Sequence, residues 1–328
     1  MTHEDVIARA DALHENGDLA QARSLYESIL AAEPGHSQAQ HQLGVLLLRV
    51  GQTEKALALI QAAAERDTGS ASLCCDLATA LNAAGKTAPA VAAYEKALIL
   101  DPDLAEAHYG LGAILFSQAR LDEALASLQR AVVIDPDYAE AHYLIGAALR
   151  QALRPAQAIR HYRNALDIDP DYAMAQAGLA GALREAKRLN EAVVEYRKAI
   201  ALDPLSADAY NGLGLVQDAQ NLPHEALASF DRALALRPDD AGIHTNRGLV
   251  LQVLGELAAA RGEFERACEL EPAASRHFFA LVNSSAEPVA ERHIQRMIDL
   301  SRNGGGLAPE EKIRLEFALH KALSDTGA

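Results

Sequence analysis

The sequence contains 328 residues, of which 50% are hydrophobic but only 5% are aromatic, and it has no tryptophan. A core made mostly of alanine and leucine favours closely packed helices over a β-sandwich. The 45 acidic and 30 basic residues give a formal net charge of -15. This charge argues against nucleic acid and anionic membranes as partners, and it leaves basic or neutral proteins as the expected ones.

No stretch approaches the roughly 18 consecutive apolar residues of a membrane-spanning helix. Residues 1–5 lack the basic and apolar character of a secretion signal. Cys74, Cys75 and Cys268 do not have the spacing of a disulfide framework or a metal site, so we expect them to be small buried side chains. These features predict a cytoplasmic protein in a reducing compartment.

The first signal along the chain is a period of 34 residues, marked by proline. From Pro34 to Pro272, a proline occurs every 34 residues, except that Thr68 stands where one proline would be expected. With residue 3 as the first position, the period divides residues 3–274 into eight consecutive repeats. A repeated sequence of this length predicts stacked supersecondary units, so the repeat has to be interpreted before any single element.

Three positions of the repeat are restricted in size. Position 20 is always alanine, position 8 is always glycine or alanine, and position 24 is always large and apolar or aromatic. In chain order, position 24 is occupied by Tyr26, Ile60, Tyr94, Leu128, Tyr162, Tyr196, Phe230 and Phe264. We expect the small residues to let two helices approach closely while the large one fills the adjoining space.

Each repeat predicts two short amphipathic helices. In the second repeat, apolar residues recur at spacings of three and four over 43–50, a turn follows at Gly51, and the spacing resumes over 56–63. The Asp-Pro pairs, such as Asp101-Pro102, mark the end of the second helix, because a residue before proline is pushed out of the helical region. The predicted fold class is all-α. Because one hairpin cannot bury its apolar face alone, we expect stability to come from stacking.

These residues resemble the tetratricopeptide repeat family, as do Leu at position 11 and Ala at position 27 in seven of the eight repeats. The resemblance implies a right-handed α-solenoid superhelix of stacked antiparallel helix pairs. The chain departs from the family at position 4, where the usual aromatic is replaced by His108, His142 and Cys74 in three repeats. It departs again at position 7, which is Arg9 and Arg247 in the terminal repeats.

The resemblance also implies a ligand groove. In the family, positions 5, 9 and 12 of each first helix point into the concave surface. The corresponding candidates here are His41, Val45, Leu48, Thr79, Asn82, Tyr109, Ala113, Phe116, Tyr143, Ala147 and Asn211. Tyr109, Phe116 and Tyr143 form an expected apolar stripe of anchors. The alternative is that the two tyrosines only pack between helices.

Arg150 and Arg184 occupy position 12 of neighbouring repeats and are expected on one face, where they could clamp an acidic group of a ligand. A structural salt bridge to an acid such as Glu185 is the equal alternative. The carboxylate clamp of chaperone-binding relatives needs Lys and Asn at positions 5 and 9, which here hold Tyr109 and Ala113 in one repeat. Binding to chaperone C-termini is therefore disfavoured.

The sequence carries no motif of an autonomous active site. The segments 110–112 and 212–214 resemble the start of a dinucleotide loop, but they lack a third glycine and a preceding strand. A phosphate-binding loop, a zinc-protease motif and a nucleophile elbow are also missing from the sequence. The prediction is therefore a chain without catalytic residues, cofactor or metal.

Residues 275–328 leave the repeat pattern and predict atypical helices that end in an incomplete hairpin. A first helix begins near Phe278, another spans about Val289 to Arg302, and residues 303–306 are expected to be flexible. A last helix from Pro309 carries an apolar stripe. Gly327 falls where the hairpin turn belongs, so the second helix that would cover this stripe is expected to be missing. Residues 310–325 are similar to the linker of bacterial repeat-containing sulfotransferases.

Three functions follow as hypotheses. The first is a scaffold that binds a protein or peptide in the concave groove. The second is the substrate-docking region of a larger transferase, of sulfotransferase or glycosyltransferase type, whose catalytic domain lies beyond residue 328. The third is a structural scaffold that associates with itself.

Overall fold

The structure is a computed structural model that describes residues 3–284, 288–303 and 307–326, and these residues form α-helices without any strand. The chain divides into an N-terminal unit, residues 1–169, and a C-terminal unit, residues 170–328. In the N-terminal unit the helices are α1 (His3–Glu15), α2 (Leu19–Ala32), α3 (Ser37–Arg49), α4 (Thr53–Arg66), α5 (Ala71–Ala83), α6 (Thr87–Leu100), α7 (Ala105–Ser117), α8 (Leu121–Ile134), α9 (Ala139–Gln151) and α10 (Pro155–Ile168).

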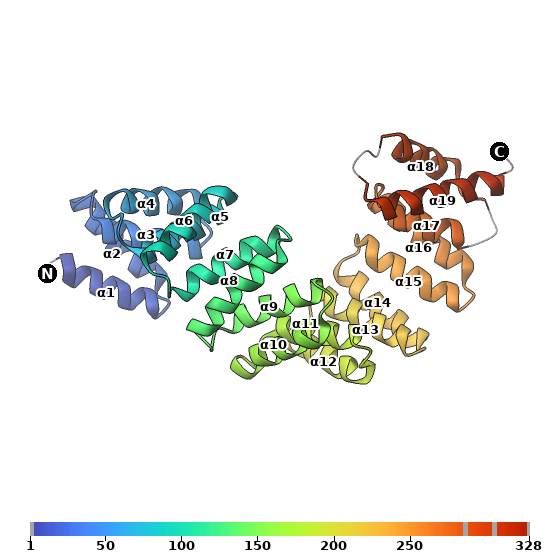
Figure 1. The fold of residues 1–328 in the computed structure, drawn as a ribbon, viewed down its shortest axis with the longest axis horizontal. Coiled ribbons are helices and arrows are strands. Elements are labelled where there is room, and N and C mark those ends of the chain that lie inside the picture. The colour runs from blue at the N-terminus through green and yellow to red at the C-terminus, as the bar shows by residue number, and fades with distance from the viewer. Residues whose placement is uncertain (1–2, 285–287, 304–306, 327–328) are drawn as a thin grey trace. The chain divides into compact units, whose positions relative to one another are not determined.

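In the C-terminal unit the helices are α11 (Ala173–Glu185), α12 (Leu189–Leu202), α13 (Ala207–Ala219), α14 (Pro223–Leu236), α15 (Ala241–Val253), α16 (Leu257–Leu270), α17 (Ser275–Asn283), α18 (Glu291–Asn303) and α19 (Pro309–Thr326). From α1 to α16, successive helices pack as pairs within each unit, as Figure 1 shows. The second helix of a pair also packs on the first helix of the next pair, and first helices touch one another. The all-α stacked architecture predicted from the repeat is therefore confirmed.

The turn inside each helix pair is built from one residue in the left-handed region. This residue is position 15 of the repeat, and its φ lies between 58° and 83° in all eight pairs. Four of the eight are glycines, which adopt this conformation without cost. The other four are Ala119, Leu153, Lys187 and Asn221. Asparagine adopts this region readily, but at the other three places the turn forms even though the side chain opposes it.

The two helices of a pair approach closely where a small residue meets a large one. A Cβ atom added at Gly146 would lie 2.9 Å from a ring carbon of Tyr162, and one added at Gly214 would lie 2.7 Å from Phe230. These residues are positions 8 and 24, which join the first helix to the second. The alanine at position 20 is fully buried in all eight pairs. The predicted role of the small residues is therefore seen in the helix contacts themselves.

In two pairs, the large residue at position 24 packs against a glycine of the next pair. Position 8 is Ala78 in one of them, and the ring of Tyr94 instead faces Gly110, on the first helix of the next pair. A Cβ at Gly110 would overlap this ring. Tyr196 and Gly212 repeat the arrangement in the C-terminal unit, where position 8 is Ala180. In these two pairs, an alanine at position 8 goes with a glycine at position 6 of the following repeat.

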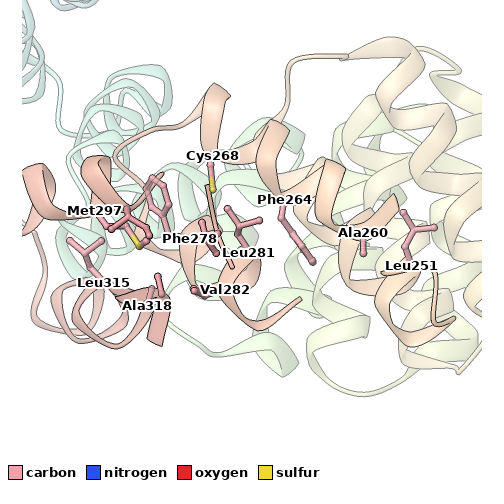
Figure 2. Packing of buried hydrophobic residues seen from close by; sticks show 13 residues of the cluster. Leu251, Ala260, Phe264, Cys268, Phe278, Leu281, Val282, Met297, Leu315 and Ala318 are labelled. Atoms are coloured by element: carbon pink, nitrogen blue, oxygen red, sulfur yellow. The ribbon is translucent and has the colours of Figure 1, made fainter. Parts of the chain in front are cut away.

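The last three helices form a compact cap on α16. Leu315 and Ala322 of α19 are completely buried, together with Phe278 of α17 and Met297 of α18. Figure 2 shows the side chains of Leu315, Ala318, Met297 and Phe278 gathered at this core. The expectation of an uncovered stripe on α19 was wrong, because α17 and α18, which precede α19 in sequence, cover it.

The same helix shows why a second helix is not needed to bury that stripe. Position 8 of α19 is Glu316, an exposed side chain at the place where the eight repeats have glycine or alanine. This face therefore lacks the close-approach site that a second helix would use. Residues 304–306 and Gly327, which were expected to form a flexible segment and a turn, lie outside the described residues.

We expect Gly146→Leu to lower the free energy of unfolding by about 1 to 3 kcal/mol, because the new side chain must displace the ring of Tyr162. Gly262→Leu is the matched control, since Gly262 lies in α16 with no atom near its missing Cβ. The control should be neutral or stabilising. Urea unfolding measures both changes, and equal effects of the two substitutions would contradict the close contact.

Candidate functional site

The first helices of the N-terminal unit, α1, α3, α5, α7 and α9, touch one another in sequence and carry the predicted groove residues. On α3, His41, Val45 and Leu48 are half-buried, whereas Thr79 and Asn82 of α5 are exposed. His41 Nε2 lies 2.6 Å from Asp76 Oδ2 on α5. A hydrogen-bonding side chain predicted to face a ligand is therefore already engaged with the neighbouring helix.

A small cavity lies at the N-terminal end of this surface. Its volume is about 330 Å³, and Val45 is the predicted groove residue in its wall. Asp11, His14, Glu15, Gln42 and Arg49 complete the lining. Asp11 Oδ1 accepts a hydrogen bond of 2.5 Å from the hydroxyl of Tyr26. The cavity thus offers mainly polar and acidic groups, which the sequence had not singled out.

The two groove tyrosines pack on neighbouring tyrosines. The ring centroids of Tyr109 and Tyr138 are 4.8 Å apart, and those of Tyr143 and Tyr162 are 5.9 Å apart. Tyr109 and Tyr143 are half-buried, and burial raises the pKa of both hydroxyl groups. Their rings therefore contribute to packing between helices, and their remaining exposed edges are what a ligand could touch.

The other predicted residues of the N-terminal unit surround these rings. Phe116 on α7 and Arg150 on α9 are half-buried, as are Ala113 and Ala147. The charge of Arg150 acts to lower the pKa of Tyr143, against the stronger effect of burial. An aromatic and cationic surface is therefore present on α7 and α9, and its role in binding remains a prediction.

Arg184 and Asn211 belong to the C-terminal unit. Arg184 Nη2 is 3.9 Å from Glu185 Oε1, and its buried Nε has no hydrogen-bond partner among the described residues. Asn211 Oδ1 accepts a 3.0 Å hydrogen bond from Asn246. Arg150 and Arg184 lie in different units, so the expectation that they share one face remains a prediction.

Sequence reasoning missed an apolar surface on the first helices of the C-terminal unit. Phe279 of α17 and Phe317 of α19 are 39% and 51% exposed, and their ring centroids lie 5.4 Å apart. Ile313 of α19 and Leu249 of α15 are also exposed. Continuing the period past residue 274 places Phe279 and Ile313 at position 5 and Phe317 at position 9, which is the signal that could have found them.

Polar side chains connect the same three helices beside these rings. Gln252 of α15 donates to the carbonyl oxygen of Asn283 at 3.0 Å, and Lys321 of α19 donates to Asn283 Oδ1 at 2.8 Å. The amide of Asn283 donates in turn to the carbonyl oxygen of Phe279. The exposed aromatic pair is thus held on hydrogen-bonded helices and offers an apolar centre with polar groups around it.

A pair of histidines lies between α9 and α10. His142 Nδ1 is 3.1 Å from His161 Nδ1, and His142 is buried. Burial lowers the pKa of both rings, and the charge of the other histidine and of Arg160 lowers the pKa of His161 further, to about 4. At neutral pH both rings are therefore uncharged and can share one hydrogen bond.

The histidine pair predicts that acid destabilises the fold. Because the folded-state pKa of His161 lies below its ordinary value of 6.5, its contribution to stability is present above pH 6.5. That contribution is lost as the pH falls from 6.5 toward 4. We expect wild type to lose about 1 to 3 kcal/mol more than His161→Gln over this interval in urea unfolding. Equal losses in the two proteins would contradict it.

One trio of described residues could approach a metal ion. Potential ligand atoms of His3, Glu33 and His36 lie within 4.8 Å of one another, although the sequence predicted no metal ligands. His36 Nδ1 accepts the hydrogen bond from the Ala39 amide that caps α3, and His3 and Glu33 are exposed. A helix cap already occupies one of the three groups, so we assign no ion to this trio.

Comparison with known families agrees with the helix geometry. Models of the tetratricopeptide repeat match residues 13–73, 78–119, 112–151, 139–172, 180–221 and 212–275. Together these matches span most of the sequence. The chain belongs to the tetratricopeptide repeat family. The comparison with curated proteins found no match.

Solved structures with the same fold have low sequence identity. The Cut9-Hcn1 hetero-tetramer of the APC/C matches with a TM-score of 0.65 and 16% identity, over 85% of this chain and 55% of that one. A tetratricopeptide repeat protein from Parabacteroides merdae matches with a TM-score of 0.56 and 18% identity, over 76% of this chain and 98% of that one. PilF from Pseudomonas aeruginosa matches with a TM-score of 0.52 and 22% identity, over 65% of this chain and 96% of that one. These similarities concern the fold alone.

Among the described residues, no helix combines enough length with enough apolar character to cross a membrane.

Proposed function

We propose that this tetratricopeptide repeat scaffold binds a peptide segment of a partner protein on the first helices of its repeats. The observation that carries the proposal is the exposed pair Phe279 and Phe317, whose rings are in contact on two neighbouring helices. Aromatic side chains that remain accessible beside hydrogen-bonding groups are typical anchors of protein recognition. The pair would receive an apolar side chain of the partner.

The polar neighbours give the rest of such a site. Lys321, Asn283 and Gln252 form a hydrogen-bonded row beside the rings, and polar side chains of this kind suit the main chain of an extended peptide. The formal charge of -15 favours a basic or neutral partner by long-range attraction. We therefore expect a peptide that combines an apolar anchor with flanking basic residues.

The surface around Tyr109, Phe116, Tyr143 and Arg150 is proposed as a second contact region. Its tyrosines are partly used for packing against Tyr138 and Tyr162, so their contribution should be smaller than that of the exposed phenylalanines.

We expect the double substitution Phe279→Ala with Phe317→Ala to weaken binding by about 2 kcal/mol or more. The probe is a 12-residue peptide selected on the wild-type protein from a random displayed library, with basic residues allowed at every position, and its affinity is measured by calorimetry. Because both rings are exposed, the double variant should unfold within about 1 kcal/mol of wild type.

Two further variants make the result specific. Tyr109→Ala with Tyr143→Ala should also weaken binding, by a smaller factor, while Ile99→Ala should leave it unchanged. Ile99 is 81% exposed on α6, a second helix of its pair. If the peptide binds the phenylalanine variant and wild type equally, the site lies elsewhere and the proposal fails.

A further inference from the structure

A second surface, on the other side of the helix pairs, depends on positions 4 and 23 of the repeat. Position 4 lies on the first helix of a pair and position 23 on the second. In three pairs the two side chains interact directly: His142 with His161 at 3.1 Å, Gln176 with Glu195, and His244 with Glu263 at 2.6 Å. These contacts bridge the two helices of the pair at this level.

Helices α17 and α18 fill the same place with apolar side chains. Phe278 is at position 4 and Met297 is at position 23 when the period is continued past residue 274. Both are almost completely buried in one cluster, and Figure 2 shows them close together. Large side chains at the two positions therefore close the space, whether they are polar or apolar.

In the pair α5 and α6 both side chains are small. Position 4 is Cys74 and position 23 is Ala93, and both line a cavity of about 370 Å³ that is open to solvent. The cavity lies between α6 and α4, over α5. The sequence therefore explains the cavity, because the third repeat has small residues at positions 4 and 23, where the helices described above have large ones.

The cavity has an apolar floor and a polar rim. Leu77 and Leu81 of α5 form the floor together with Cys74, and Ala64 and Ala93 form the sides. Burying apolar atoms of a ligand here would be favourable, because it removes them from water. The lining as a whole can therefore hold an apolar group.

Opposite charges stand on the two sides of the opening. Gln61 and Glu65 belong to α4, and Lys96 belongs to α6. Gln61 donates a 3.4 Å hydrogen bond to Glu65, whereas Lys96 makes no ion pair within the described part of the chain. An exposed ammonium group beside an apolar pocket is complementary to a carboxylate that follows an apolar side chain.

We propose that this cavity is a second peptide-binding site, which holds a leucine- or methionine-sized side chain of a partner and pairs Lys96 with an acidic residue next to it. This site is independent of the first-helix surface proposed above, because it is built from other positions of the repeat. It differs from that surface in the ligand as well, since it prefers an acidic neighbour to the anchor.

The probes are two blocked dipeptides, acetyl-Leu-Asp-amide and acetyl-Leu-Asn-amide, titrated into the labelled protein and followed by amide NMR shifts. We expect saturable shifts over residues 61–96 and an affinity about two- to five-fold higher for the Asp peptide, the range of an exposed ion pair. Lys96→Ala should remove this preference. Lys55→Ala, which removes an exposed lysine of α4 outside the cavity, should keep it.

Filling the cavity gives the deciding test. Cys74→Phe and Ala93→Met copy the side chains that α17 and α18 have at these positions, and each should abolish the shifts without lowering the melting temperature. Strong destabilisation by both variants would show that the space is not free, and the proposal would fail. It would also fail if the two dipeptides bound equally, or if toluene bound while neither dipeptide did.

Discussion

The contact between a glycine on the first helix and a large residue on the second is the constraint on which five of the helix pairs depend. Gly146 against Tyr162 and Gly248 against Phe264 leave no room for even one additional carbon atom. This contact sets how closely the helices approach and therefore which side chains of the first helix remain accessible. Position 8 packs inward, whereas position 5, three residues before it, and position 9, the next residue, carry the candidate binding residues. The packing of the core therefore determines which face of the first helices is accessible.

Much of this could be predicted from the sequence. The invariant alanine at position 20 and the proline spacing indicated the helix pairs, because their periodicity reflects packing that recurs in each repeat. The turns at Leu153 and Ala119 could not be predicted from their residue types, since neither residue favours a positive φ. Backbone hydrogen bonds from each turn back to the end of the first helix hold this conformation, such as those from Leu153 to Arg150 and from Arg154 to Leu149. The ring of Tyr94 likewise depends on Gly110 in another repeat, which a pattern within one repeat does not reveal.

The candidate site was predicted only in part. Tyr109 and Tyr143 were identified correctly as residues of the first helices, but their contacts with other tyrosines come from tertiary structure. Phe279 and Phe317 were missed because residues after 274 no longer show the small positions of the repeat. The period nevertheless continues through α17, α18 and α19 in the spacing of their helices. The cavity beside Cys74 required both the sequence difference at position 4 and the neighbouring helices that line it.

A double-mutant cycle between Gly146 and Tyr162 tests the central contact most directly. In the wild-type background, Gly146→Ala should lower the free energy of unfolding, because the new Cβ would lie 2.9 Å from the ring. In the Tyr162→Leu background the same change should be neutral or stabilising, since alanine is the better helix former by about 1 kcal/mol. The predicted result is a coupling free energy of about 1 to 3 kcal/mol between the two positions. An identical effect of Gly146→Ala in both backgrounds would contradict the account.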